Sequence, residues 1–122
     1  MFEKETSNDV VIGKINLSRA TYKEAEEFRK FMQFDVITGQ NKYIINMETL
    51  KYIDSTFLGI LINSLKQIEK RGGHLKLASV HNNARNILDI TGISNIFKIY
   101  PDTDKALKSF LEASHVIHEK IT

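Results

Sequence analysis

Apolar positions follow two different periods along the chain, and each change of period marks a change of structural element. Short blocks rich in β-branched or aromatic residues predict strands, which fall at 2–6, 10–15, 42–47, 74–80 and 96–100. Apolar residues spaced three and four apart predict helices, which begin near Thr21, Asp54, Asn82 and Pro101. The chain therefore alternates between strands and helices after an opening pair of strands.

Capping and turn residues support the predicted ends of the first two helices. Thr21 and Glu24 form the Thr-x-x-Glu pattern of a capping box, in which each side chain bonds to the backbone of the other residue. The second helix is expected to run from about Asp54 to about Arg71. Gly72-Gly73 ends it, because glycine adopts the left-handed conformation without a steric penalty.

Strands that alternate with helices need crossover connections, and right-handed crossovers produce a mostly parallel sheet. We therefore expect an α/β fold with a small mixed sheet of four to five strands and helices mainly on one face. The opening strands supply an antiparallel edge. Residues 1–112 are expected to form one domain, and residues 113–122 either extend the last helix or form a frayed tail.

Composition narrows the function classes further. The 122 residues are 42% hydrophobic and 26% charged, which is typical of a soluble globular domain. A net charge of +2 argues against nucleic-acid binding, which usually needs a concentrated basic face. The absence of cysteine excludes disulfides and thiolate catalysis, and no apolar run approaches the ~20 residues of a membrane span. We expect a cytoplasmic protein that is not attached to a membrane.

Conventional catalytic motifs are missing from the sequence, so we do not expect an enzyme. No Gly-x-Ser-x-Gly elbow is present, and Gly72-Gly73 follows a helix where a phosphate-binding loop would precede one. His115 and His118 stand three apart, and Glu112 or Glu119 could add an oxygen ligand. Such pairs on a terminal helix are usually solvated, and we expect no metal site.

Three consecutive polar residues interrupt apolar sequence where the second helix begins. Asp54 or Ser55 can cap this helix by accepting a bond from a free amide of its first turn. The same free amides and the positive end of the helix dipole would tolerate a phosphate on Ser55 or Thr56. Gly59, one turn later, would let a partner approach closely. Capping and phosphate acceptance are compatible, so both interpretations stay open.

The sequence resembles STAS domains and, among them, the bacterial anti-sigma factor antagonists. The resemblance covers nearly the whole chain through 12–16, 44–47, 53–61, 70–75, 88–93, 96–97 and 104–107. Asp54-Ser55-Thr56 followed by Gly59 is moderately specific by itself. Gly72-Gly73 and Thr91-Gly92-Ile93 at their expected places make the resemblance strong.

The resemblance implies a phosphorylation switch at Ser55, with Thr56 as second choice and with Asp54 and Gly59 supporting the site. In such antagonists the unphosphorylated form binds an anti-sigma factor that is also a serine kinase, and a sigma factor is released. Phosphorylation ends this binding, and a PP2C-type phosphatase resets the cycle. No cofactor is expected on this chain, because ATP and Mg²⁺ would belong to the partner kinase.

Two segments depart from the family pattern. Members commonly have glycine where Phe57 stands, and that ring either crowds a kinase active site or packs inward. The segment at the end of the second strand usually contains two carboxylates. Lys14 and Asn16 stand at these positions here and make this segment, which we call the lip, more basic.

The sequence thus yields a leading and an alternative interpretation. In the leading one, the switch at Ser55 controls a partner surface, which we expect to comprise Asn16, Ser18, Thr21, Asp54, Thr56, Phe57, Asn83 and Asn86. In the alternative, the tripeptide at 54–56 only caps a helix, and the domain is an adaptor or scaffold that binds another protein constitutively.

Overall fold

The computed structural model describes the backbone of residues 1–121 and the side chains of residues 1–112. Five strands form the central sheet in the order β1–β2–β4–β6–β7. Their bounds are β1 Phe2–Ser7, β2 Val10–Ile15, β4 Lys42–Asn46, β6 His74–Ala78 and β7 Ile99–Tyr100. β1 pairs with β2 in antiparallel register, and the remaining neighbours are parallel. The mixed, mostly parallel sheet expected from the sequence is confirmed.

Four α-helices connect or follow these strands, as the apolar periodicity predicts. They are α1 Tyr22–Thr38, α2 Ser55–Lys70, α3 Asn82–Ile90 and α4 Thr103–Ile121. The predicted capping box at the start of α1 is present, with the Thr21 side chain and Glu24 both bonded as expected. His115 and His118 lie outside the residues whose side chains the structure describes. No helix in the described part of the chain is long and apolar enough to cross a membrane.

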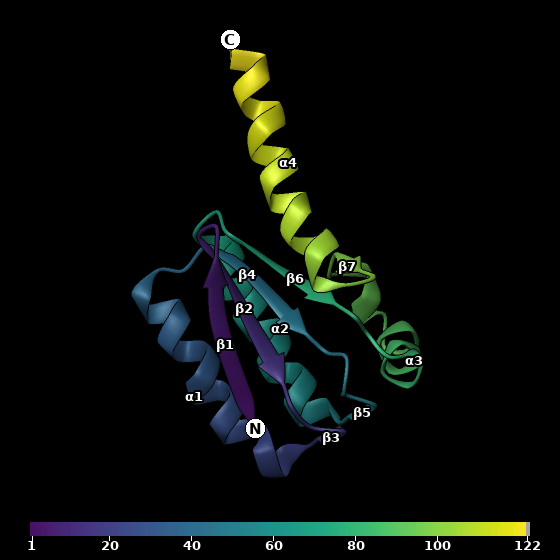
Figure 1. Ribbon diagram of the computed structural model, residues 1–122. Coiled ribbons are helices and arrows are strands. Elements are labelled where there is room, and N and C mark those ends of the chain that lie inside the picture. The colour runs from purple at the N-terminus through teal and green to yellow at the C-terminus, as the bar shows by residue number, and fades with distance from the viewer. Residues whose placement is uncertain (122) are drawn as a thin grey trace.

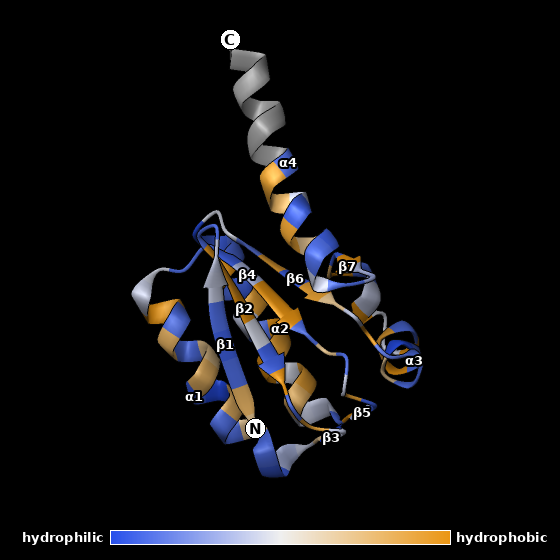
Figure 2. Ribbon diagram, in the orientation of Figure 1, coloured by the Kyte–Doolittle hydropathy of each residue, from blue (hydrophilic) through white to orange (hydrophobic). Residues whose placement is uncertain are grey.

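The sheet separates two unequal apolar layers (Figure 1). Alternation along β4 shows how: Tyr43 and Ile45 face the larger core beneath α1, α2 and α3, whereas Ile44 faces α4. The smaller layer consists of Val10, Ile44, Ala78, Ala106 and Phe110. Figure 2 shows the apolar residues concentrated on the inner strands, with polar residues along β1 and the outer faces of the helices. The expectation that helices lie mainly on one face is confirmed.

Two local features differ from the sequence prediction. The strand expected at 96–100 is shortened to β7, because the amides of Ile96 and Phe97 bond back to the Ile93 carbonyl and extend the 3₁₀ turn Ile93–Asn95 into the expected strand. Two further strands were not expected: β3, Arg19–Ala20, pairs in parallel with β5, Tyr52–Ile53. This short ladder ties the segment before α1 to the segment before α2, and so fixes the two helix starts relative to each other.

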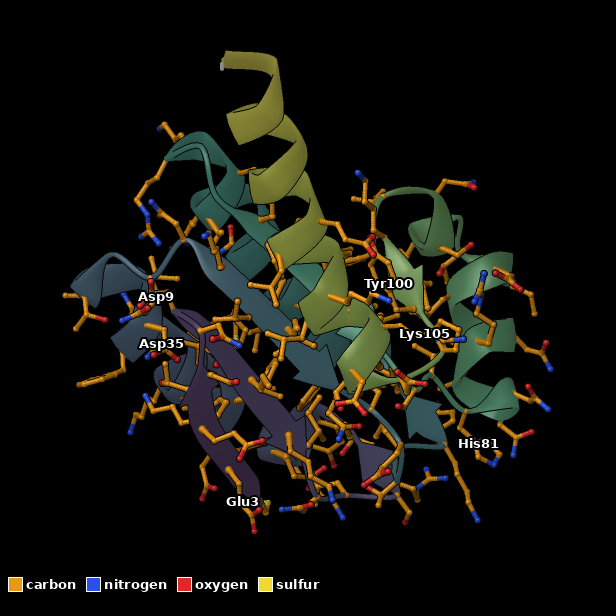
Figure 3. The ribbon with its side chains drawn as sticks, turned by 45° about the horizontal axis from the view of Figure 1, so that its top comes forward. Glu3, Asp9, Asp35, His81, Tyr100 and Lys105 are labelled. Atoms are coloured by element: carbon orange, nitrogen blue, oxygen red, sulfur yellow. The ribbon has the colours of Figure 1, made fainter. Side chains whose placement is uncertain are left out.

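A buried polar cluster joins the edge of the sheet to α1. The Asp35 carboxylate, with 3% of the residue exposed, accepts hydrogen bonds from the Tyr43 hydroxyl at 2.9 Å and from Lys4 Nζ at 3.1 Å. Figure 3 shows Asp35 where α1 meets the β1–β2 hairpin. Burial, together with the neighbouring Asp35 carboxylate, raises the pKa of Tyr43 far above its ordinary value. Tyr43 therefore stays a neutral hydrogen-bond donor.

The double glycine after α2 serves two separate needs of the backbone. Gly72 has a φ of +82°, which a residue with a side chain rarely adopts. A Cβ on Gly73 would lie 2.5 Å from the carbonyl oxygen of Asn41, so only glycine fits there without moving the backbone. The predicted end of the second helix is confirmed, and the close approach places β6 directly beside the segment that leads into β4.

Candidate functional site

The carboxylate of Asp54 closes the amino-terminal ends of two helices. Asp54 Oδ1 accepts a hydrogen bond from the Phe57 amide at 2.9 Å, which caps α2. Asp54 Oδ2 accepts a hydrogen bond at 2.7 Å from the amide of Tyr22, which is the first residue of α1. Free amides at helix starts favour negative charge, so the site suits a carboxylate. Of the two capping residues left open by the sequence, Asp54 performs the role.

Ser55 and Thr56 are therefore not needed for capping, and both are exposed. Among the described side chains, neither hydroxyl takes part in a hydrogen bond with another residue. Ser55 is the first residue of α2, directly after the Asp54 carboxylate. A reagent or protein that approaches this end of the molecule can reach both hydroxyls without opening the fold.

Phe57 points away from this surface and into the core. Its side chain is fully buried, and its ring stacks on that of Phe28, with the centroids 4.3 Å apart. The expectation that Phe57 contributes to a partner surface is therefore wrong for its side chain. Of the two alternatives for this residue, inward packing is the one observed, because the third position of α2 faces α1 and the sheet. The ring does not obstruct access to Ser55.

Backbone hydrogen bonds, as well as side chains, form the lip between β2 and α1. The Ser18 carbonyl accepts bonds from the amides of Lys51 and Tyr52, and the Asn16 amide donates to the Met1 carbonyl. Ser18 is exposed, while Asn16 and Thr21 are half-buried. These three predicted residues lie at the same end of the molecule as the start of α2, because β3 and β5 pair there.

The expected increase in positive charge along this lip is only partly observed. Lys14 forms a 2.7 Å ion pair with Glu48, and this hydrogen bond raises the pKa of the Lys14 amine. Its charge is thus compensated within the chain. The positive charges at this end that form no ion pair with any described side chain include those of Arg19 and Lys23.

Asn83 and Asn86 are exposed on α3, which contacts β5. The helix begins after His81, whose Nδ1 accepts a bond from the Asn83 amide at 3.1 Å. Figure 3 shows His81 at the end of the molecule where α3 starts. Asn83 thus belongs to this end, and Asn86 lies about one helical turn farther along α3.

A hollow of about 500 Å³ lies beside Asp54, and the sequence did not indicate it. Tyr22 and Tyr52 line it with 66% and 40% of their surfaces exposed, and the guanidinium of Arg19 lies 4.4 Å from the ring centroid of Tyr52. The available signal was an aromatic residue beside each helix cap, since Tyr22 follows Thr21 and Tyr52 shortly precedes Asp54. Isolated tyrosines belong to no recognisable sequence motif. The β3–β5 pairing brings these two close together, and the sequence did not predict that pairing.

Only some polar groups at this end of the molecule remain free of hydrogen bonds to the rest of the described chain. No group of three or more potential metal ligands occurs among the described residues. Both oxygens of the Asp54 carboxylate already accept backbone amides. What remains accessible is a pair of hydroxyls near a hollow that two tyrosines, two basic and two acidic side chains line.

Replacing Asp54 with alanine is expected to lower the free energy of unfolding by about 2 kcal/mol, because one carboxylate satisfies two helix-start amides. Urea unfolding followed by circular dichroism measures this change. Ser55→Ala, whose hydroxyl caps nothing, is the matched control and is expected to change stability by less than about 0.5 kcal/mol. Equal losses for the two variants would contradict the assignment of Asp54 as the cap.

Comparisons with known proteins agree with the observed architecture. Residues 2–106 match a family model described as the STAS domain. A Thermotoga neapolitana protein, named as a candidate anti-sigma factor antagonist, is 31% identical over 109 residues that cover 88% of this chain and 96% of the relative. The anti-sigma-B factor antagonist of Bacillus subtilis is 36% identical over 55 residues, which are 45% of this chain and 50% of the relative.

Solved structures show the same arrangement of elements. The crystal structure of a candidate anti-sigma factor antagonist from Thermotoga maritima aligns with a TM-score of 0.80 at 28% identity, covering 88% of this chain and 92% of the other. The phosphorylated form of Bacillus SpoIIAA aligns with a TM-score of 0.71 at 17% identity, covering 90% and 99%. At the latter identity the similarity is one of fold.

Proposed function

Because this chain belongs to the STAS domain family and has relatives named anti-sigma factor antagonists, we propose that it antagonises an anti-sigma factor. Unphosphorylated, it binds an anti-sigma factor that is also a serine kinase, which frees a sigma factor for transcription. The kinase phosphorylates Ser55, and a PP2C-type phosphatase removes the phosphate. In this scheme the chain is a cytoplasmic binding protein and kinase substrate with no catalytic step of its own.

The observation that supports this proposal is the free, exposed hydroxyl of Ser55 beside a cap that Asp54 already provides. Phosphorylation would join Ser55 Oγ to the γ-phosphorus of ATP. The bond from that phosphorus to ADP breaks, and the hydroxyl proton passes to a base of the kinase. ATP and Mg²⁺ are supplied by the kinase, and this chain supplies only the acceptor oxygen. Thr56 is the second acceptor in reach on the same exposed turn.

Phosphorylation would weaken binding through charge and bulk, with the domain still folded. A phosphate adds a charge of about −1.5 to −2 beside the Asp54 carboxylate. The start of α2 offsets only about 0.3–1 kcal/mol of the resulting repulsion. A partner that covers this turn must desolvate the added charge, which is costly. The phosphorylated protein would therefore dissociate from its partner.

Phosphorylation of Ser55 is expected to reduce affinity for the anti-sigma factor by at least about 30-fold, equivalent to about 2 kcal/mol. The chain is incubated with the anti-sigma factor kinase and Mg·ATP, and intact mass is followed until one phosphoryl group has been added. Isothermal titration calorimetry then compares the phosphorylated and unphosphorylated forms. Ser55→Asp is expected to fall between them, because it adds one charge where phosphate adds up to two.

The matched controls are Ser55→Ala and Thr56→Ala. Ser55→Ala should bind the partner and remain unphosphorylated, whereas Thr56→Ala should accept phosphate like the wild type. Phosphorylation lost only in Thr56→Ala would move the acceptor to the neighbouring residue. Binding without phosphorylation of any variant would favour the constitutive adaptor over the switch.

A further inference from the structure

The hollow beside Asp54 contains four charged side chains that fall into two groups. Its two carboxylates bind backbone amides at the helix starts. Glu24 accepts a hydrogen bond from the Thr21 amide at 3.0 Å, and Asp54 accepts hydrogen bonds from the amides of Tyr22 and Phe57. The positive ends of α1 and α2 offset part of the charge on these carboxylates. Neither carboxylate forms an ion pair with the other two charged groups that line the hollow.

Those other two groups are cationic and lack an acidic partner. Arg19 and Lys23 form no ion pair with a described side chain, and the guanidinium of Arg19 rests on the ring of Tyr52. The stacking holds Arg19 in place while its N–H groups remain available. A second exposed aromatic residue, Tyr22, lies on the same hollow. Tyrosine and arginine around a concave site are among the residue types most enriched in binding hot spots.

We propose that this hollow receives an acidic side chain of the anti-sigma factor, an inference that rests on the proposed function. Arg19 pairs with the incoming carboxylate and Lys23 adds a second positive charge. Tyr22 and Tyr52 cover the apolar stem of the incoming residue. The anti-sigma factor that fits this chain therefore presents an aspartate or glutamate opposite the hollow.

The same placement connects the hollow to the control of binding. Asp54 lines the hollow and Ser55 follows it directly, so a phosphate on Ser55 adds negative charge beside the seat of the incoming carboxylate. Like charges repel more strongly in a surface that excludes water. Phosphorylation thus acts against the specific contact that selects the partner, besides adding bulk to the surface.

The test is a charge reversal measured without ATP, so that it does not depend on phosphorylation. Calorimetry compares Arg19→Glu and Lys23→Glu with the wild type, using the purified anti-sigma factor as the probe. We expect Arg19→Glu to weaken binding by at least about 30-fold and Lys23→Glu by about 5-fold. The matched control is Lys105→Glu, an exposed lysine at the start of α4 on the other layer of the molecule (Figure 3), expected to bind within about twofold of the wild type.

A compensating reversal in the partner completes the experiment. Substituting lysine for the facing carboxylate of the anti-sigma factor should restore binding to Arg19→Glu and weaken binding to the wild type. If both reversals in the hollow bind within about twofold of the wild type while Ser55 is still phosphorylated, the inference is overturned and the proposed function stands. If the wild type neither binds the anti-sigma factor nor is phosphorylated by it, the proposed function fails and the inference fails with it. Thermal unfolding midpoints of the variants separate lost contacts from lost folding.

Discussion

Replacing Phe57 with alanine is expected to lower the free energy of unfolding by about 3–5 kcal/mol, the largest loss that we expect from a single substitution in this domain. The side chain is fully buried and stacks on Phe28 at 4.3 Å, and Phe2 packs on the same rings with its centroid 6.3 Å from that of Phe57. Truncation removes these contacts and leaves a cavity where the edge strand, α1 and α2 meet. Chemical denaturation followed by circular dichroism measures the loss.

The neighbouring residue provides the control for this prediction. Thr56 is exposed and its hydroxyl bonds to no described side chain, so Thr56→Ala should change stability by less than about 0.5 kcal/mol. A small effect of Phe57→Ala would mean that the ring is not part of the core. It would also reopen the alternative that Phe57 faces an approaching kinase.

Asp35→Ala is expected to lower the free energy of unfolding by about 3 kcal/mol, because it leaves the Tyr43 hydroxyl and the Lys4 amine without their acceptor. The Tyr43 hydroxyl is sealed in the core and cannot turn to water, so most of the cost arises there. Equilibrium unfolding of Asp35→Ala, Tyr43→Phe and the double variant measures the coupling between the two residues. We expect the double variant to be less destabilised than the sum of the single variants.

Lys4→Met is the control for the same cluster. The Lys4 side chain is 34% exposed and its amine can be hydrated, whereas the Asp35 carboxylate is buried and would keep only the Tyr43 hydroxyl as a donor. We expect a loss of about 1–2 kcal/mol, below that of Asp35→Ala. A larger loss for Lys4→Met than for Asp35→Ala would contradict the view that the buried hydroxyl dominates the cluster.

The sequence predicted those parts of the fold that depend on local patterns. The capping box at Thr21 and Glu24 and the double glycine at 72–73 each act over a few residues, and each lies where expected. The α/β class followed from the alternation of elements. The start of the strand expected at 96–100 was less predictable, because a 3₁₀ turn such as Ile93–Asn95 produces no periodic signal.

The candidate site was only partly predictable, because its key contacts join distant parts of the chain. The bond from the Tyr22 amide to Asp54 spans 32 positions, and the β3–β5 pairing involves two residues on each side. No spacing rule signals such short ladders. The inward direction of Phe57 was likewise undecided from sequence, because a helix start exposes some positions and buries others according to how it sits on the sheet.

The outer edge of β1 disfavours assembly of the domain with itself. Two copies that joined antiparallel along this edge would form one continuous sheet, and residues directly opposite each other would have to lie on the same face. Each register that pairs most of Phe2–Ser7 then sets Glu3 against Glu5 or Glu5 against Glu5. The open row of backbone donors and acceptors along this edge, which in other proteins promotes aggregation, is thus protected by the repulsion between its own carboxylates.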